Sequence, residues 1–345
     1  MQAAAAAGLL LFAGGSGHTA DPDATVPEGY MKLTIAGGAV TSRINTVVSA
    51  PLLKHPSVEG AIHGKITSVG NGTLGHATAG WTPGALSNPS APTLVRLVSG
   101  AAAGRTFLIA SSPANTENQF HVDASDLGGS TLAALGVAAG DEYRLHACAT
   151  LLGLFGTPAG TGVQAGASLA SADQVQILIN GSWQNFYFHS ALGRWTRNFF
   201  GQPDASHLPI RPDSAVLYGR LAAAPMHLNW MGSIPHSPRK AQVPATLSAF
   251  LSTGWPKDLT LGTSGIEQIP GWISAPTFAA SDTVSIYVSG SWRNFWHDGT
   301  VWRRNFFGFP SSDTQVLPAS GGILLNRKTA AASTLQQSLP YTLEP

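Results

Sequence analysis

Tryptophans are the residues of this sequence whose type and placement best suit ligand binding. Eight of the nine lie between residues 183 and 302. Sugar rings stack their apolar faces on exposed indoles, while Asn, Arg and Asp side chains bond the hydroxyl groups. Trp255, Trp272 and Trp296 stand outside the repeated pattern described below, so they are the candidate ligand-binding residues. Packing in the core or between repeats is the alternative interpretation of the same indoles.

Signatures of catalysis and metal binding are missing from the sequence. It contains no H-E-x-x-H, G-x-S-x-G or C-x-x-C motif, and its carboxylates do not single out a glycosidase pair. Residues 70–75 match G-x-G-x-x-G but run into a proline-containing loop, so Asn71-Gly72 is interpreted as a hairpin turn. Asp173 and Asp282 recur at matching places, where we expect them to accept backbone amides. We therefore predict no enzyme activity, no catalytic residue, no cofactor and no metal site.

The charge composition argues against nucleic acid as a partner. Charged residues make up 11% of the chain, well below the roughly 25% of ordinary soluble domains, and the formal net charge is +1. A chain with so little net charge has no strong electrostatic field to attract nucleic acid or anionic lipid at long range. Arginines do alternate with aromatic residues near positions 194–197 and 293–304, but their stems also cover aromatic faces in ordinary hairpins. The single cysteine, Cys148, is expected to be a small buried hydrophobe.

The elements that must position these residues come from a duplication. Residues 173–220 contain N-G-S-W-Q-N-F, W-T-R-N-F-F-G and a closing P-D-S, and residues 282–327 contain S-G-S-W-R-N-F, W-R-R-N-F-F-G and P-A-S in the same order. Residues that recur at matching places in a duplicated unit are first of all scaffold. We therefore expect the recurring indoles, Trp183, Trp195, Trp292 and Trp302, to pack inside the protein.

Each copy has the pattern of a β-hairpin. Apolar residues alternate along its first strand, at Val175, Ile177 and Ile179 in one copy and at Val284, Ile286 and Val288 in the other. Asn180-Gly181 and Ser289-Gly290 follow these strands and suit tight turns with positive φ angles. Each copy therefore presents one apolar face to a core.

Further pairings extend the repeat and set the predicted domain boundaries. Residues 45–51 and 229–235 share N-x-x-x-S-x-P and are predicted to be the opening strand of each half, while residues 149–155 and 245–250 are predicted to form matching helical turns. The first β module then comprises residues 30–59 and 148–224, and the second comprises residues 225–345. Residues 60–147 carry their own strand signals and are predicted to be a small inserted β-barrel.

The N-terminus has the pattern expected of a targeting signal, and an Ala-rich tail is the alternative interpretation. An apolar run over residues 3–15 is too short to span a bilayer and is followed by a small-residue stretch, which favours a signal peptide over residues 1–20. No later run is long and apolar enough to predict a membrane span.

Several segments resemble a known family. The opening N-T-V-V-S-A-P-L, the L-V-S-G-A-A-A-G-R-T-F and G-D-E-Y-R-L of the insert, and the twin W…P-x-S…R closures are similar to a verrucomicrobial family of uncharacterised exported proteins. The resemblance implies secretion and β structure, and it carries no established activity or site.

Together these patterns predict an all-β protein of two related β-sandwich-like modules, the first interrupted by a small β-barrel. The expected role is that of an exported, non-catalytic cell-surface or extracellular protein for structure or adhesion, secreted or held in the cell envelope. A carbohydrate-binding protein that uses exposed tryptophans of the second module is the alternative. The expected partners are polysaccharide or other envelope proteins.

Overall fold

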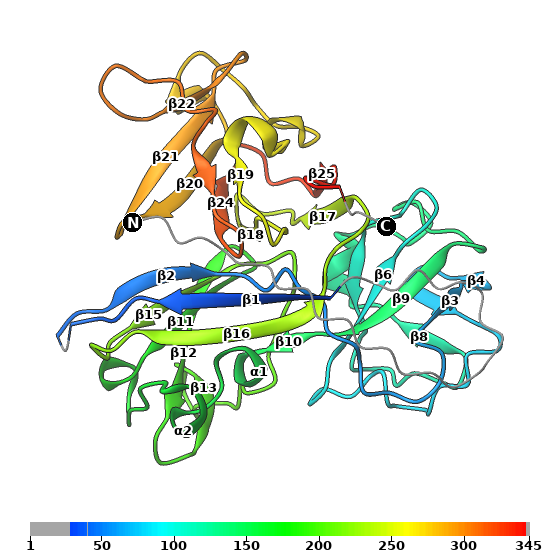
Figure 1. The fold of residues 1–345 in the computed structure, drawn as a ribbon. Helices are drawn as coiled ribbons and strands as arrows, with labels where there is room; N and C mark the ends of the chain where they lie inside the picture. Colours follow the sequence, from blue (N-terminus) through cyan, green and yellow to red (C-terminus); the bar gives the residue numbers. More distant parts are fainter. Residues whose placement is uncertain (1–27, 40, 343–345) are drawn as a thin grey trace.

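Short antiparallel strands make up most of the regular secondary structure, with only a few short helical turns, which confirms the predicted all-β fold class. A computed structural model describes residues 28–39 and 41–342 (Figure 1). The predicted signal peptide, residues 1–20, lies outside the described residues. Within the part that is described, no helix has the length and apolar character needed to cross a bilayer.

The first module is a five-stranded sheet covered by a smaller one. The sheet has the order β13-β12-β11-β15-β2, with β2 at Ile44–Val48, β11 at Gln174–Ile179, β12 at Ser182–His189, β13 at Arg194–Arg197 and β15 at Val216–Arg220. The long strands β1 (Glu28–Ile35) and β16 (Met226–Ser233) pair with each other, as do the short β10 (Ala149–Thr150) and β14 (Pro209–Ile210). The helices α1 (Leu151–Phe155) and α2 (Pro158–Thr161) and the 3-10 turn η2 (Leu169–Ser171) connect β10 to β11.

The second module repeats this arrangement strand for strand. Its five-stranded sheet has the order β22-β21-β20-β24-β18, with β18 at Ser248–Ser252, β20 at Thr283–Val288, β21 at Ser291–His297, β22 at Trp302–Arg304 and β24 at Gly322–Asn326. β17 (Arg239–Val243) pairs with β25 (Ser333–Gln337), and β19 (Leu259–Thr260) pairs with β23 (Val316–Leu317). Three 3-10 turns, η3 (Leu261–Thr263), η4 (Ile266–Gln268) and η5 (Phe278–Ala280), lie between β19 and β20. The duplication therefore covers an entire module, from β1 to β16 and from β17 to β25.

The predicted boundary between the modules at residue 225 is wrong. β16 pairs with β1 over its whole length, and its inward residues Met226, Leu228 and Trp230 lie in the first core. Residues 229–235 are thus not the opening strand of the second module, because the strand that corresponds to β2 is β18. The predicted helical turn at residues 245–250 is also wrong, since this short apolar run continues into strand β18, whereas its partner at residues 149–155 does contain α1.

The insert between β2 and β10 forms two small open sheets rather than a closed barrel. One has the order β3-β9-β6-β7 and the other has the order β4-β5-β8. Their strands are β3 (His63–Lys65), β4 (Ser68–Val69), β5 (Thr73–Gly75), β6 (Thr93–Leu97), β7 (Thr106–Leu108), β8 (Gln119–His121) and β9 (Glu142–Ala147), with a 3-10 turn η1 at Ala124–Leu127. Strands of two to six residues are too short to curl round one another, and a shared core joins the two sheets instead. Asn71-Gly72 connects β4 to β5, so this motif is the predicted hairpin.

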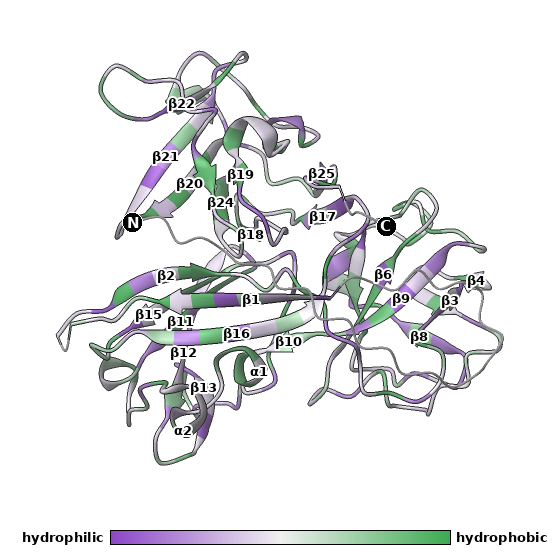
Figure 2. Cartoon of the chain, viewed as in Figure 1, coloured by the Kyte–Doolittle hydropathy of each residue, from purple (hydrophilic) through white to green (hydrophobic). Residues whose placement is uncertain are grey.

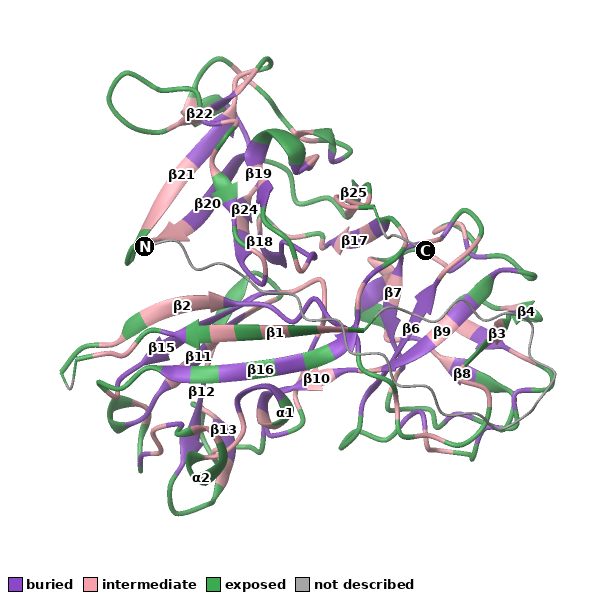
Figure 3. Ribbon diagram, viewed as in Figure 1, coloured by how far each residue is buried: buried purple, intermediate pink, exposed green. Residues whose placement is uncertain are grey.

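Each module and the insert has its own apolar core. Polar and apolar residues alternate along β1 and β16 (Figure 2), and the same alternation between exposed and buried positions is visible on β16 in Figure 3. Cys148 is buried as predicted, and burial raises the pKa of its thiol to about 12. The thiol therefore stays protonated at neutral pH and behaves as an apolar group.

The two modules meet through a nearly symmetric contact. Ser49 N–H at the end of β2 donates to Ser320 O (2.8 Å), and Ser252 N–H at the end of β18 donates to Asp213 O (2.9 Å). Phe250 of β18 is buried at this contact among Ala215 and Leu217 of the first module and partly buried neighbours from both. The arrangement resembles the isologous interface of a dimer, here formed between two halves of one chain.

Candidate functional site

Two of the three predicted ligand-binding tryptophans lie in the interior. Trp255 is 0% exposed and packs edge to face against Tyr341, and Trp296 is 2% exposed between Phe278 and Phe309. A buried indole offers no face on which a sugar ring can stack, so the prediction that Trp255 and Trp296 are exposed is wrong. The physical reason is that large aromatic rings supply much of the packing of this short-stranded module.

Trp272 is the least enclosed of the three. It is half-buried and packs against the fully buried Trp302 with a centroid distance of 5.8 Å. The structure does not bring Trp272 together with Trp255 or Trp296 in a common aromatic contact among the described residues. The three tryptophans therefore form no shared stacking platform.

The recurring tryptophans divide into two structural roles. Trp195 and Trp302 occupy matching positions in the two cores, which confirms that they pack inside. Trp183 is 39% exposed, so the expectation that it packs inside is wrong, and Trp292 is half-buried. Both pack edge to face on Phe250, at centroid distances of 5.4 and 6.0 Å. Because Phe250 belongs to the second module, the contact from Trp183 crosses between the modules, whereas the contact from Trp292 lies within the second.

The matching acidic residues are part of the scaffold. Each of Asp173 and Asp282 accepts two backbone N–H groups, as predicted: Gln164 and Leu221 donate to Asp173, and Ile273 and Lys328 donate to Asp282, at distances between 2.6 and 2.9 Å. In each module these bonds connect the loop before the first hairpin strand to the residue that directly follows Arg220 or Arg327. Over the described ranges, no three His, Cys, Asp or Glu side chains are grouped so that they could hold a metal ion.

The most exposed large apolar residues form a matched pair of loops, which we call the Phe tips. The first tip is residues 198–201 and the second is residues 305–308, both with the sequence N-F-F-G. Phe200 and Phe307 are each 95% exposed, and their neighbours Phe199 and Phe306 are 61% and 59% exposed. The two modules therefore expose a phenylalanine to solvent at the same position of the repeat.

The backbone holds both tips in the same conformation. Phe199 N–H donates to Arg197 O and Phe306 N–H donates to Arg304 O, each at 2.8 Å, while Asn198 and Asn305 donate at 2.8 Å to the neighbouring strand. Both tips end in a glycine with φ 77° followed by a residue with φ 45°, a left-handed pair that turns the chain back towards the sheet. The phenylalanines are therefore displayed by a defined turn.

An arginine accompanies each tip. The Arg197 guanidinium lies 4.9 Å from the ring centroid of Phe199, and that of Arg304 lies 4.7 Å from Phe306. The nearby carboxylates pair with other arginines, Asp204 with Arg194 and Asp298 with Arg303, so neither Arg197 nor Arg304 has an ion-pair partner among the described residues. Each tip thus combines a free apolar ring with an available cation.

The sequence contains a signal for the tips that the tryptophan argument missed. Both F-F pairs lie between a hairpin strand and a G-x-P turn, outside the alternating strand pattern, where a loop is normally polar. A recurring apolar pair in a loop cannot be assigned to the core by periodicity. That mismatch could have nominated the tips.

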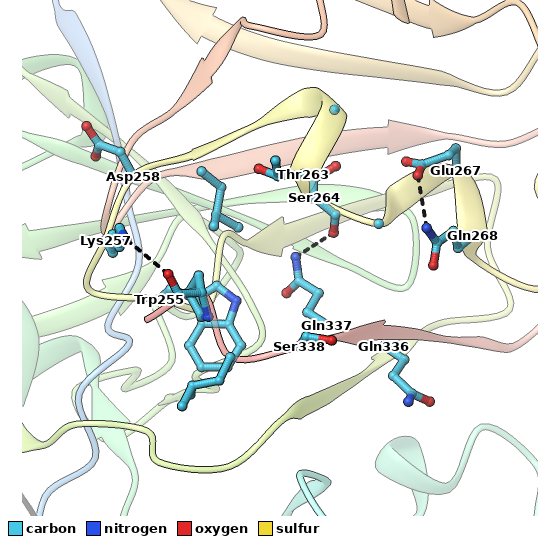
Figure 4. Close-up of a pocket in the computed structure, with 15 residues that line it drawn as sticks. Trp255, Lys257, Asp258, Thr263, Ser264, Glu267, Gln268, Gln336, Gln337 and Ser338 are labelled. Carbon is cyan, nitrogen blue, oxygen red and sulfur yellow. Dashed lines mark hydrogen bonds between the residues drawn. The ribbon is translucent and has the colours of Figure 1, made fainter. Parts of the chain in front are cut away.

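A polar pocket of about 510 Å³ lies beside Trp255 (Figure 4). Its polar side chains largely bond to their own surroundings: Lys257 Nζ donates to Pro340 O (3.0 Å), and Gln337 Nε2 donates to Ser264 O (2.8 Å). Trp255 contributes to the wall but is itself buried. The pocket therefore lacks the open aromatic face that the carbohydrate hypothesis requires.

A second cleft, of about 470 Å³, lies where the insert meets both modules. Asp126 in its wall lies 2.7 Å from Arg211 Nε and accepts Leu108 N–H at 2.6 Å. Burial, which outweighs the attraction of Arg211, raises the pKa of Asp126 to about 6. Because the carboxylate is occupied by these internal partners, the cleft offers no free charged group from Asp126 to a ligand.

Comparisons with known protein families, with curated proteins and with solved structures find no match to this chain.

Proposed function

We propose that this is an exported, non-catalytic attachment protein of the cell surface, envelope or extracellular matrix, and that the Phe tips make its contacts. The observation that carries the proposal is the 95% exposure of both Phe200 and Phe307 in equivalent, hydrogen-bonded turns. Folding alone does not favour an apolar ring in water, and apolar groups gathered at a surface mark interaction sites.

Export is supported by the sequence. The short apolar segment near the N-terminus, the low content of charged residues and the resemblance to an exported family all favour a destination outside the cytoplasm. The non-catalytic role is supported by the internal use of Asp173 and Asp282, whose oxygens are occupied by backbone amides.

The experiment is attachment of the purified protein to envelopes isolated from the producing cells. The double variant Phe200→Ser/Phe307→Ser should lose most of the binding seen with the native chain, because it removes the exposed rings without touching a core. Met231→Ser provides the matched control, since Met231 is an exposed apolar residue on β16 away from the tips. Equal binding by the native chain and the double variant would contradict the proposal, as would recovery of the native protein from the cytoplasm alone.

A further inference from the structure

The size and shape of the Phe tips restrict what they can bind. Two phenylalanines at these exposures offer about 300 Å² of apolar surface per tip. A stable protein–protein interface buries about 800 Å² on each partner. Each tip is also a turn at the end of a strand, so it projects from the sheet instead of forming a groove. A small projecting apolar group is best enclosed by a surface that can deform around it.

The composition of the tips matches the boundary region of a lipid bilayer. Aromatic rings are favoured where the acyl chains meet the headgroups, and guanidinium groups bond lipid phosphates just outside that level. Arg197 and Arg304 lie beside the first ring of each tip and lack a carboxylate partner in the described chain, while the second ring remains free. With a formal net charge of +1, attraction to an anionic surface is a minor contribution.

We propose that the Phe tips insert into the headgroup–acyl boundary of a lipid bilayer, with Arg197 and Arg304 at the level of the phosphates. This inference rests on the proposed function and names the partner of the same surface. The strands that lead into the tips, β13 and β22, lie at opposite ends of the view in Figure 1. Each tip therefore engages lipid independently of the other, and one bilayer contacts one tip at a time, so the two tips act as separate binding sites.

The test is co-sedimentation with protein-free phosphatidylcholine vesicles. The native chain should sediment with the vesicles. Phe200→Ser and Phe307→Ser should each weaken binding, and the double variant should reduce it by roughly tenfold or more, because most of the inserted apolar area is lost. Met231→Ser should bind like the native chain. Vesicles with added phosphatidylserine should bind only slightly better, which separates apolar insertion from charge attraction.

A second measurement locates the tip directly. In Phe307→Trp the new indole should gain emission that lipids with brominated acyl chains quench, whereas the same change at exposed Met231 should give no quenching. Failure of the native chain to bind vesicles, or an unquenched indole in vesicle-bound Phe307→Trp, overturns the lipid assignment. If the tip variants still lose binding to whole envelopes in that case, the proposed attachment function stands with a protein or polysaccharide partner.

Discussion

Asp173 and Asp282 each accept two backbone N–H groups at equivalent positions of the two modules, but their electrostatic surroundings differ. Asp173 also forms a buried ion pair with Arg220 at 2.6 Å and accepts the hydroxyl of Tyr218 at 2.8 Å. Burial, with the Asp173 carboxylate second, raises the pKa of Tyr218 well above its usual range, so that hydroxyl remains a donor. Asp282 accepts its two amides without such a pair in the described structure. The first module therefore has a buried charged network around Asp173, whereas the carboxylate of Asp282, at the equivalent position of the second module, bonds only to the two backbone amides among the described residues.

At the residue scale, His146 should make the stability of the protein depend on pH. This imidazole of β9 is buried, its Nδ1 has no hydrogen-bond partner in the described chain, and burial followed by nearby Arg96 lowers its pKa to about 3. In the unfolded chain the pKa of this imidazole is about 6.5. As the pH falls below that value, the unfolded chain binds a proton that the folded chain does not bind, so the folded state loses stability.

The expected result is that the native chain loses about 2 kcal/mol of unfolding free energy relative to His146→Gln between pH 7 and pH 5. Above pH 7 the difference should be constant, because the imidazole is neutral in both states. Urea unfolding of both proteins at several pH values measures it. Parallel pH profiles for the two proteins would show that His146 is not the titrating group.

At the element scale, the two hairpin turns offer a reciprocal test of turn chemistry. Asn180 and Ser289 occupy the same position with φ angles of 50° and 51°, each followed by a glycine with positive φ. Asn tolerates this left-handed region better than Ser. Ser289→Asn should therefore stabilise the second module by about 0.5–1 kcal/mol, and Asn180→Ser should destabilise the first by a similar amount. Thermal unfolding checks both, and shifts of the same sign would count against this account.

At the scale of the whole molecule, Phe250 should couple the two modules. It is buried between Trp183 of the first module and Trp292 of the second. Phe250→Ala should cost about 3–5 kcal/mol through the cavity it leaves, with most of the loss at the contact between modules. Calorimetry should then show the unfolding transitions of the two modules separating in temperature, whereas Phe307→Ala, at a position that is 95% exposed, should leave them unchanged. An unchanged separation between the transitions of the two modules would show that Phe250 does not couple them.

Local patterns were sufficient to predict the first strand and the tight turn of each repeated hairpin. The alternation at Val175 and Ile177, and its repeat at Val284 and Ile286, defined β11 and β20 because side chains on a strand alternate between its two faces. The dipeptides Asn180-Gly181 and Ser289-Gly290 similarly fixed the turns through their positive φ angles. These are properties of neighbouring residues, so they can be recognised without knowledge of the rest of the chain.

The sequence by itself determined the all-β class, the duplication and the packing of the recurring core indoles Trp195 and Trp302. Only the tertiary structure assigned residues 226–233 to the first module, because their partner β1 lies almost two hundred residues earlier in the chain. It also decided that Trp255 is buried and Phe200 exposed. Exposure depends on which distant segments cover a side chain, and such contacts follow no local period.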